Sequence, residues 1–233
     1  MSGICRIRTL NIEVGANKKF KLMKKLLFIT VLFLGMMSSK AQEAQFGARV
    51  AVSFTNLRAV ALKSDANDFV AEQNKAFKSL TNFELGAFAE FMLSDQIAIA
   101  PELNYAGAGS DLSGHDGDGD YTGNVSLTYI QIPVMIKYYV NENISINVGP
   151  QIGFLGSATA FFEQGDYSKT YDMKDEYNST DLGLNIGGSY KMENGLFFDL
   201  RYYLGMSGLQ KNAEYSDLKN TGLKFGVGYY FNN

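Results

Sequence analysis

The sequence predicts an all-β fold: an eight-stranded up-and-down antiparallel transmembrane β-barrel with short periplasmic turns and long extracellular loops. Between Gln45 and Phe231, eight segments alternate apolar and polar residues, which is the two-residue period of a β-strand. The connections between these segments go long, short, long, short, long, short, long. A segment with the layout of an export signal precedes the first strand. An even strand number and this asymmetry of connections are typical of outer-membrane barrels.

The N-terminal segment has the three parts of a signal peptide. Met23-Lys24-Lys25 is a basic start, the run from Leu26 to Met37 is apolar, and small residues end at Ala41. The apolar run is shorter than the roughly 20 residues that a membrane-spanning helix needs. We therefore predict a leader over residues 1–41, with translation starting at Met23 and cleavage after Ala41. Residues 42–233 are predicted to form one barrel domain.

Composition narrows the possible partners. The leader holds 8 of the 21 basic residues and 1 of the 24 acidic ones, which leaves 13 basic against 23 acidic residues after cleavage. Nucleic acid is excluded as an expected partner, because binding to phosphate needs a basic surface. The one cysteine, Cys5, leaves with the leader. Disulfides and thiol chemistry are therefore not expected.

Each predicted strand is long enough to cross a bilayer at a tilt, which takes roughly 9–11 residues. On one face of every strand the side chains are almost all apolar, as at Ile130, Ile132 and Ile136. The strands are expected at 45–54, 80–93, 96–107, 124–140, 143–155, 180–191, 195–207 and 219–231.

The opposite face carries polar and charged side chains with four acids and four bases, so their charges cancel. In a membrane barrel these side chains fill the lumen. An eight-stranded barrel is just wide enough for side chains to fill. We therefore predict a neutral polar network in the lumen, formed by Arg49, Glu84, Glu90, Glu102, Gln131, Lys137, Asp199, Arg201 and Lys224.

Aromatic residues gather where the strands meet the short turns, as expected of a girdle at the bilayer interface. The short turns are predicted at Ser94-Asp95, Asn141 to Asn143 and Glu193 to Gly195, and the long loops at 55–79, 108–123, 156–179 and 208–218. Because the first loop is long, both termini are expected in the periplasm. The girdle is predicted from Phe91, Tyr138, Tyr139, Tyr190, Phe197, Phe198, Tyr229, Tyr230 and Phe231.

Several strands resemble a known family. Residues 129–139 resemble the "YxEIPLLLKY" strand of the Bacteroidetes outer-membrane β-barrel family that includes PorT-like proteins, and residues 148–153 are similar to its "GPYIG" strand. Residues 181–188, 201–205 and 223–231 resemble later strands of that family, and 46–57 its first strand. The resemblance covers nearly all of 42–233 and implies the fold and the cell outer membrane. One departure is Gln131, where the family carries an acid.

A weak calcium candidate lies in the second long loop. Asp116, Asp118 and Asp120 have the i, i+2, i+4 spacing that opens an EF-hand loop, but the closing glutamate is replaced by Leu127. We therefore expect no metal site, and a solvated loop tip instead. His115 is the only histidine. In a glycine-rich loop it is not expected to act as a general base.

The third long loop is the best candidate for contact with other envelope proteins, because Phe161, Phe162, Tyr167, Tyr171 and Tyr177 lie among its acids. The sequence therefore predicts an integral outer-membrane protein of structural or interaction type, with outer-membrane lipids as partners, no catalysis and no cofactor. One alternative is a soluble exported barrel that binds a small apolar ligand, as lipocalins do. Another is an accessory component of a secretion or gliding apparatus, which rests on the PorT-like resemblance alone.

Overall fold

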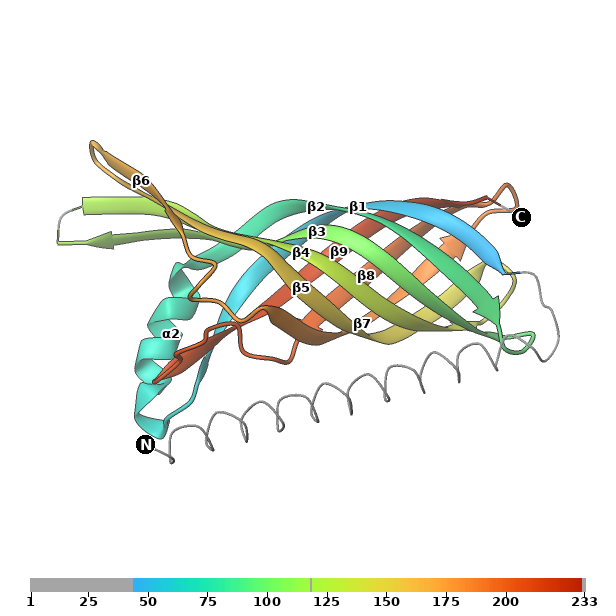
Figure 1. The fold of residues 1–233 in the computed structure, drawn as a ribbon, viewed down its shortest axis with the longest axis horizontal. Helices are drawn as coiled ribbons and strands as arrows, with labels where there is room; N and C mark the ends of the chain where they lie inside the picture. Colours follow the sequence, from blue (N-terminus) through green and yellow to red (C-terminus); the bar gives the residue numbers. More distant parts are fainter. Residues whose placement is uncertain (1–43, 118, 232–233) are drawn as a thin grey trace, which may run out of the picture. The chain divides into compact units, whose positions relative to one another are not determined.

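The computed structural model describes residues 44–117 and 119–231, and Figure 1 shows these residues as a continuous β structure with the helix α2 at one end. The predicted leader lies outside the described residues. The elements are β1 (Gln45–Ala61), the 3-10 helix η1 (Ser64–Ala66), α2 (Asn67–Ala76), β2 (Phe77–Met92), β3 (Ile97–Asp116), β4 (Gly119–Tyr139), β5 (Ile144–Gln164), β6 (Tyr167–Asp172), β7 (Thr180–Lys191), β8 (Leu196–Gly205) and β9 (Ser216–Tyr230).

Eight of these strands close into a ring, which confirms the predicted barrel. Each strand pairs antiparallel with its neighbour in the order β1, β2, β3, β4, β5, β7, β8, β9. The ring closes where β9 pairs with β1, from Gly47 opposite Tyr230 to Ala61 opposite Ser216. β6 stands outside the ring and pairs with the distal part of β5. Closure leaves no free edge within the ring itself, as a barrel in lipid requires.

The three short turns lie where they were predicted, between β2 and β3, β4 and β5, and β7 and β8. Three of the long loops were predicted wrongly. The 55–79 loop contains the end of β1, η1 and α2, and the 108–123 loop is an extended β3–β4 hairpin. The 156–179 loop contains the distal half of β5 and all of β6. Figure 1 shows these hairpins projecting beyond one rim of the barrel, at the end where α2 lies.

No helix within the described ranges is long and apolar enough to cross a membrane.

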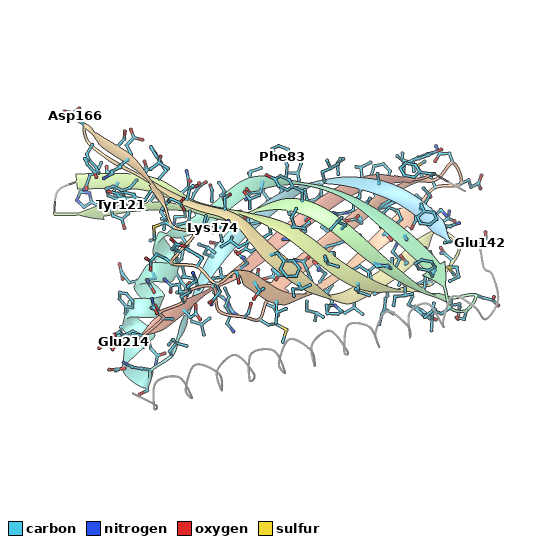
Figure 2. The ribbon with its side chains drawn as sticks, in the orientation of Figure 1. Phe83, Tyr121, Glu142, Asp166, Lys174 and Glu214 are labelled. Carbon is cyan, nitrogen blue, oxygen red and sulfur yellow. The ribbon has the colours of Figure 1, made fainter. Side chains whose placement is uncertain are left out.

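The outer wall of the barrel carries an exposed apolar band. Along β5 the outward side chains run from Ile144 to Phe154 and are aliphatic or aromatic, apart from Pro150. That length matches the roughly 9–11 residues of a tilted spanning strand. Phe83, at the hairpin end of the band on β2, is 72% exposed and points away from the barrel in Figure 2. Such a surface is stable only when something apolar covers it, and lipid chains do so around a whole ring.

Beyond the rim the polarity of the two faces reverses along the same strands. In β4, Gln131 points into the barrel and Ile130 points out. Two turns of the pleat further on, Leu127 and Val125 point inward and are buried, while the outward residues are Ser126, Asn124 and Thr122. The register between β4 and β5 shifts at this point, between Thr128 and Tyr129. The reversal marks the edge of the apolar band.

Candidate functional site

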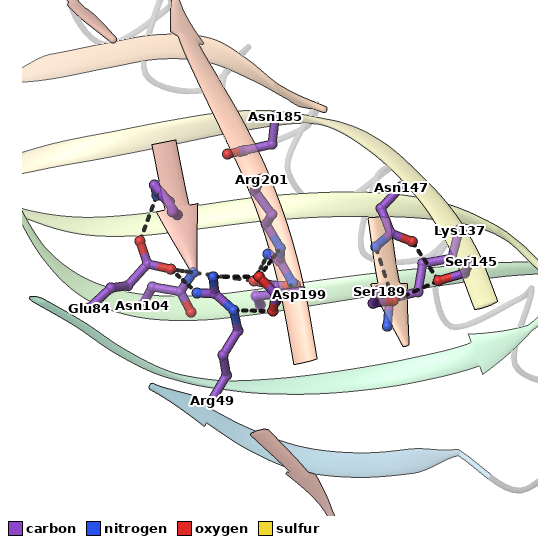
Figure 3. A network of polar contacts seen from close by, with 12 residues as sticks. Arg49, Glu84, Asn104, Lys137, Ser145, Asn147, Asn185, Ser189, Asp199 and Arg201 are labelled. Carbon is purple, nitrogen blue, oxygen red and sulfur yellow. Dashed lines mark hydrogen bonds and ion pairs between the residues drawn. The ribbon is translucent and has the colours of Figure 1, made fainter. Parts of the chain in front are cut away.

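The middle of the lumen holds a continuous network of ion pairs. Arg49 bonds Asp199 with both Nε (2.5 Å to Oδ2) and Nη2 (2.8 Å to Oδ1), and it also pairs with Glu84. The second oxygen of Glu84 accepts a bond of 2.5 Å from Lys224 Nζ, which also donates to Gln131 at 3.2 Å. These side chains come from five strands and are at most 6% exposed. Figure 3 shows the Arg49 side chain reaching between Glu84 and Asp199.

A second branch of the network starts at Arg201. Its Nη1 donates to Glu102 Oε2 at 2.8 Å, and its Nε lies 3.3 Å from Asp199 Oδ1. Asn104 donates to both Glu84 and Glu102 at 3.2 Å, which joins the two branches. Burial of so many charges is tolerated because each one has an opposite partner and further hydrogen bonds.

Glycine makes this packing possible. A Cβ at Gly226 would lie 2.6 Å from Arg49 Nε, and one at Gly86 would lie 1.8 Å from Asn104 Oδ1. The guanidinium and the amide therefore occupy space that any other residue would fill.

At the short-turn end the lumen is closed by aromatic rings. Phe88, Phe197 and Tyr230 are buried there and contact one another with centroid distances of 5.0 to 5.5 Å. Glu90 sits beside them and accepts hydrogen bonds from Lys137 Nζ (2.5 Å), Tyr230 Oη (2.7 Å) and Tyr139 Oη. With these contacts, all nine residues of the predicted network are buried on the inward face, at 5% exposure or less.

This arrangement corrects the predicted girdle. Phe197 and Tyr230 are each 2% exposed and point inward. Neighbouring residues of a strand face opposite sides, so a run of aromatics cannot lie wholly on one face. The outward members of the predicted girdle are Tyr138, Tyr190, Phe198, Tyr229 and Phe231, all at least 45% exposed.

The hairpin end of the lumen is closed by an apolar cluster that was not predicted from the sequence. Leu57, Leu127, Tyr129 and Leu209 are each 1% exposed or less, and they pack with other inward residues. Tyr177 lies in the third long loop, 156–179, which was predicted to contact other envelope proteins, but its side chain is buried in this cluster. Burial raises the pKa of Tyr177 to about 12, so the hydroxyl stays protonated.

Asp181 was also missed. Its carboxylate is 2% exposed and accepts hydrogen bonds from Asn220 Nδ2 (2.8 Å) and Ser207 Oγ (3.1 Å). No lysine or arginine of the described chain forms an ion pair with it. The predicted balance of four acids and four bases therefore omits one buried acid. The signal that could have found it is its alternation with the outward residues Leu182 and Leu184.

The calcium candidate does not gather a ligand set among the described residues. Asp118 lies outside them, as does the side chain of Asp116. Asp120 is exposed and its Oδ1 lies 2.9 Å from His115 Nδ1. No group of three acidic, histidine or cysteine side chains in the described ranges is placed to hold a metal ion. The tip is solvated, with the side chains of His115 and Asp120 75% and 90% exposed, and it belongs to a paired hairpin and not to an irregular loop.

The strand register sorts the aromatics of the predicted contact loop onto different faces. Phe162 pairs with Lys169, and the flanking pairs place Tyr167 and Tyr171 on the same face. Tyr121 of β4 joins that face, because its ring stacks on Phe162 at 5.9 Å and 27°. Phe161 points to the opposite face. Figure 2 shows Tyr121 and Asp166 on the projecting hairpins.

A closed ring of eight strands, an outward apolar band and a polar, buried lumen together define an integral outer-membrane β-barrel protein. The soluble lipocalin-like alternative is wrong, because it requires an apolar interior and a polar outer wall. Residues 39–211 match the profile of the outer membrane protein beta-barrel domain family, and the chain belongs to that family. Its location is the cell outer membrane, and lipid is its immediate neighbour.

The chain is similar to several solved structures at low sequence identity. Neisserial surface protein A is 14% identical, with 82% of this chain and 100% of that chain covered and a TM-score of 0.48. Ail of Yersinia pestis is 15% identical, with 82% and 100% covered and a TM-score of 0.44. The outer membrane protease OmpT of Escherichia coli is 8% identical, with 80% and 97% covered and a TM-score of 0.43. Comparison with curated protein sequences gave no match.

Proposed function

We propose that this chain is a non-catalytic outer-membrane protein of the PorT-like, Bacteroidetes type, whose lumen is filled by its own side chains and whose long hairpins contact other envelope proteins. The observation that carries the proposal is the ion-pair network from Arg49 to Arg201, which crosses the lumen between five strands. A barrel packed in this way is a rigid support for the segments on its rim.

The packing above and below the network supports a closed lumen. The aromatic cluster around Phe88 lies on the short-turn side, and the apolar cluster around Leu127 lies on the hairpin side. A solute would have to displace three layers of buried side chains. By the usual orientation of outer-membrane barrels, the short turns face the periplasm and the hairpins face outside.

Conductance tests the closed lumen directly. The purified chain, inserted into a planar lipid bilayer, is expected to give no current steps in potassium chloride. Steady steps in wild-type protein would contradict a filled lumen. Heat-modified electrophoretic mobility of the same sample shows that the barrel is folded.

The hairpins carry the contact surface in this proposal. All six residues of β6 are exposed, and one edge of this strand has no partner strand among the described residues. An unpaired edge invites pairing with another chain. Tyr167 and Tyr171, at 51% and 39% exposure, add aromatic surface of the kind enriched in protein interfaces.

Site-specific photo-cross-linking in intact outer membranes tests this contact. A benzophenone amino acid at Tyr167 or at Tyr171 is expected to give the same protein adduct. The matched control is Phe198, which is similarly exposed but faces lipid, and it is expected to give none. Adducts from Phe198 alone, or from neither tyrosine, would contradict the proposal. The identity of the adduct also tests membership in a secretion or gliding apparatus, which the PorT-like resemblance suggests.

A further inference from the structure

A groove lies on the hairpin side, between α2 and the projecting β3–β4 hairpin. Its volume is 340 Å³, near the lower end of the roughly 300–1,000 Å³ that is usual for small-molecule sites. The groove lies outside the lumen network and does not involve the free edge of β6. Its described lining includes Phe69, Glu72, Gln73, Ser113, His115 and Tyr121.

Both walls of the groove are anchored. On the helix side, Asn74 exchanges two hydrogen bonds with the backbone of Ala59, at 2.8 and 3.1 Å. Gln73 Oε1 accepts a hydrogen bond of 2.9 Å from Ser216 Oγ. On the other side, β3 and β4 are paired up to the turn. Hydrogen bonds therefore fix both walls of the groove. A preorganised site favours binding, because little conformational entropy is lost when the ligand binds.

The aromatic rings are placed for contact with a ligand. Phe69 is 54% exposed although it is a large apolar residue. Tyr121 lies across the sheet over Gly114, where a Cβ would come within 2.3 Å of Tyr121 Oη. Phe162 stacks on the same ring and supports it. Glycine at 114 thus lets the tyrosine ring lie against the strand.

The remaining lining is polar. Glu72 offers acceptor oxygens, and Gln73 offers amide N–H donors beside the oxygen that accepts from Ser216. Ser113 and His115 line the groove along β3, but the strand register places their side chains on the face opposite to Tyr121. The only aliphatic side chain among the described lining residues is Ala76. An acyl chain would need aliphatic walls, and an anion would need more cations than Lys75, which already lies 3.6 Å from Glu72.

We propose that this groove binds a saccharide. A sugar ring has a C–H face that packs on aromatic rings and a rim of hydroxyls that exchange hydrogen bonds with mixed donors and acceptors. Phe69 and Tyr121 take the C–H faces, and Glu72 and Gln73 take the hydroxyls. The glycan is either free polysaccharide or the head of a glycolipid, since both present the same groups.

A glycan array with the folded, detergent-purified chain tests the proposal. The array carries neutral, amino-sugar and uronic-acid oligosaccharides, and the chain is expected to bind at least one class. Phe69→Ala and Tyr121→Ala are each expected to weaken that binding about five- to tenfold, the loss of one aromatic contact. Phe161→Ala is the matched control, because this ring lies on the opposite face of the same sheet. Its binding is expected to equal that of wild type.

Two outcomes overturn the proposal: no oligosaccharide binds the wild-type chain, or binding survives in both Phe69→Ala and Tyr121→Ala. Phe69 is exposed, so its variant is expected to fold, and heat-modified mobility checks both variants. Competition by lipopolysaccharide micelles against the bound oligosaccharide distinguishes a glycolipid source from a free glycan. Conductance and cross-linking at β6 are independent of these readouts, so a failure here is separable from a failure of the proposed function.

Discussion

The strands β3, β4 and β5 run through two different surroundings, and their inward and outward faces change character between them. Within the apolar band, the inward side of β4 carries Gln131 and Lys137, and the outward side carries Ile132 and Ile136. Beyond the rim, the inward side carries Leu127 and Val125 and the outward side carries polar residues. A strand has no fixed polar face, because the solvent on its outer side decides which residues are stable there.

The inside of the molecule follows from the same rule. Where lipid covers the barrel wall, apolar side chains are stable on the outer face, and ion pairs connect the strands across the interior. Where water covers the wall, the apolar residues turn inward and form an ordinary hydrophobic cluster. Along a single strand, the packing thus changes from that of a membrane protein to that of a water-soluble domain.

The largest expected effect comes from breaking the charge pairs in the lipid-covered stretch. Arg201→Ala leaves Glu102 and part of Asp199 buried without a cation, and the variant is expected to lose about 3–5 kcal/mol of unfolding free energy. Urea unfolding in lipid vesicles measures this loss. The matched control is Arg58→Ala, an exposed arginine beyond the rim, which is expected to change stability by less than about 0.5 kcal/mol. Equal effects of the two variants would remove the distinction between the regions.

A lysine scan along the outward face of β4 locates the reversal. Ile132→Lys places a charge in the apolar band and is expected to cost about 2–4 kcal/mol. Asn124→Lys, on the same face beyond the rim, is expected to stay within about 0.5 kcal/mol of wild type. Vesicle unfolding of both variants measures the difference. A similar cost at both positions would show that the band extends further than the reversal indicates.

Truncation in the hairpin-side cluster sharpens the comparison from the other direction. Leu127→Ala removes a side chain that is 1% exposed, and about 2–3 kcal/mol of stability is expected to be lost. The loss is expected in α2 and the hairpins, while the ring survives. Limited proteolysis is the measurement: faster cleavage outside the band, with a protected barrel fragment of unchanged size. Cleavage within the band strands would count against two separable regions.

The smallest effect is expected at an exposed ion pair. Lys63 and Glu214 lie 3.4 Å apart, with side chains 45% and 72% exposed. Glu214→Gln is therefore expected to change stability by less than about 1 kcal/mol, and less still in high salt. Thermal unfolding at low and high salt checks this, and a loss like that of Arg201→Ala would contradict it.

Much of the barrel was predictable because the band imposes a strict two-residue contrast. Ile130 is apolar because it faces lipid, and Gln131 is polar because it faces the lumen. This alternation predicts the number of strands, their two faces and the short turns. The hairpins were not predictable in the same way. Residues 108–123 alternate between small and polar types, such as Gly109 and Ser110, which gives no contrast between faces.

The helix and the lumen ends show two other limits. α2 has no fully buried residue, so no apolar stripe marks it in the sequence. Phe197 and Tyr230 were assigned to lipid because they are aromatic, although alternation with Phe198 and Tyr229 places them inside. Asp181 was left out of the predicted network, although its alternation with Leu182 and Leu184 places it on the inward face of the predicted strand 180–191.

The pairing of β1 with β9 has a kinetic consequence. Of the eight ring strands described, the first and the last in the chain are neighbours, and the ring closes only when they pair. Contacts between residues so far apart in the chain form slowly, because the entropy of closing a long loop is lost before any stabilising hydrogen bond is made. Until then the edges of β1 and β9 are both unpaired and prone to aggregate. Productive assembly therefore depends on keeping the unfolded chain apart from its copies until β9 can pair with β1.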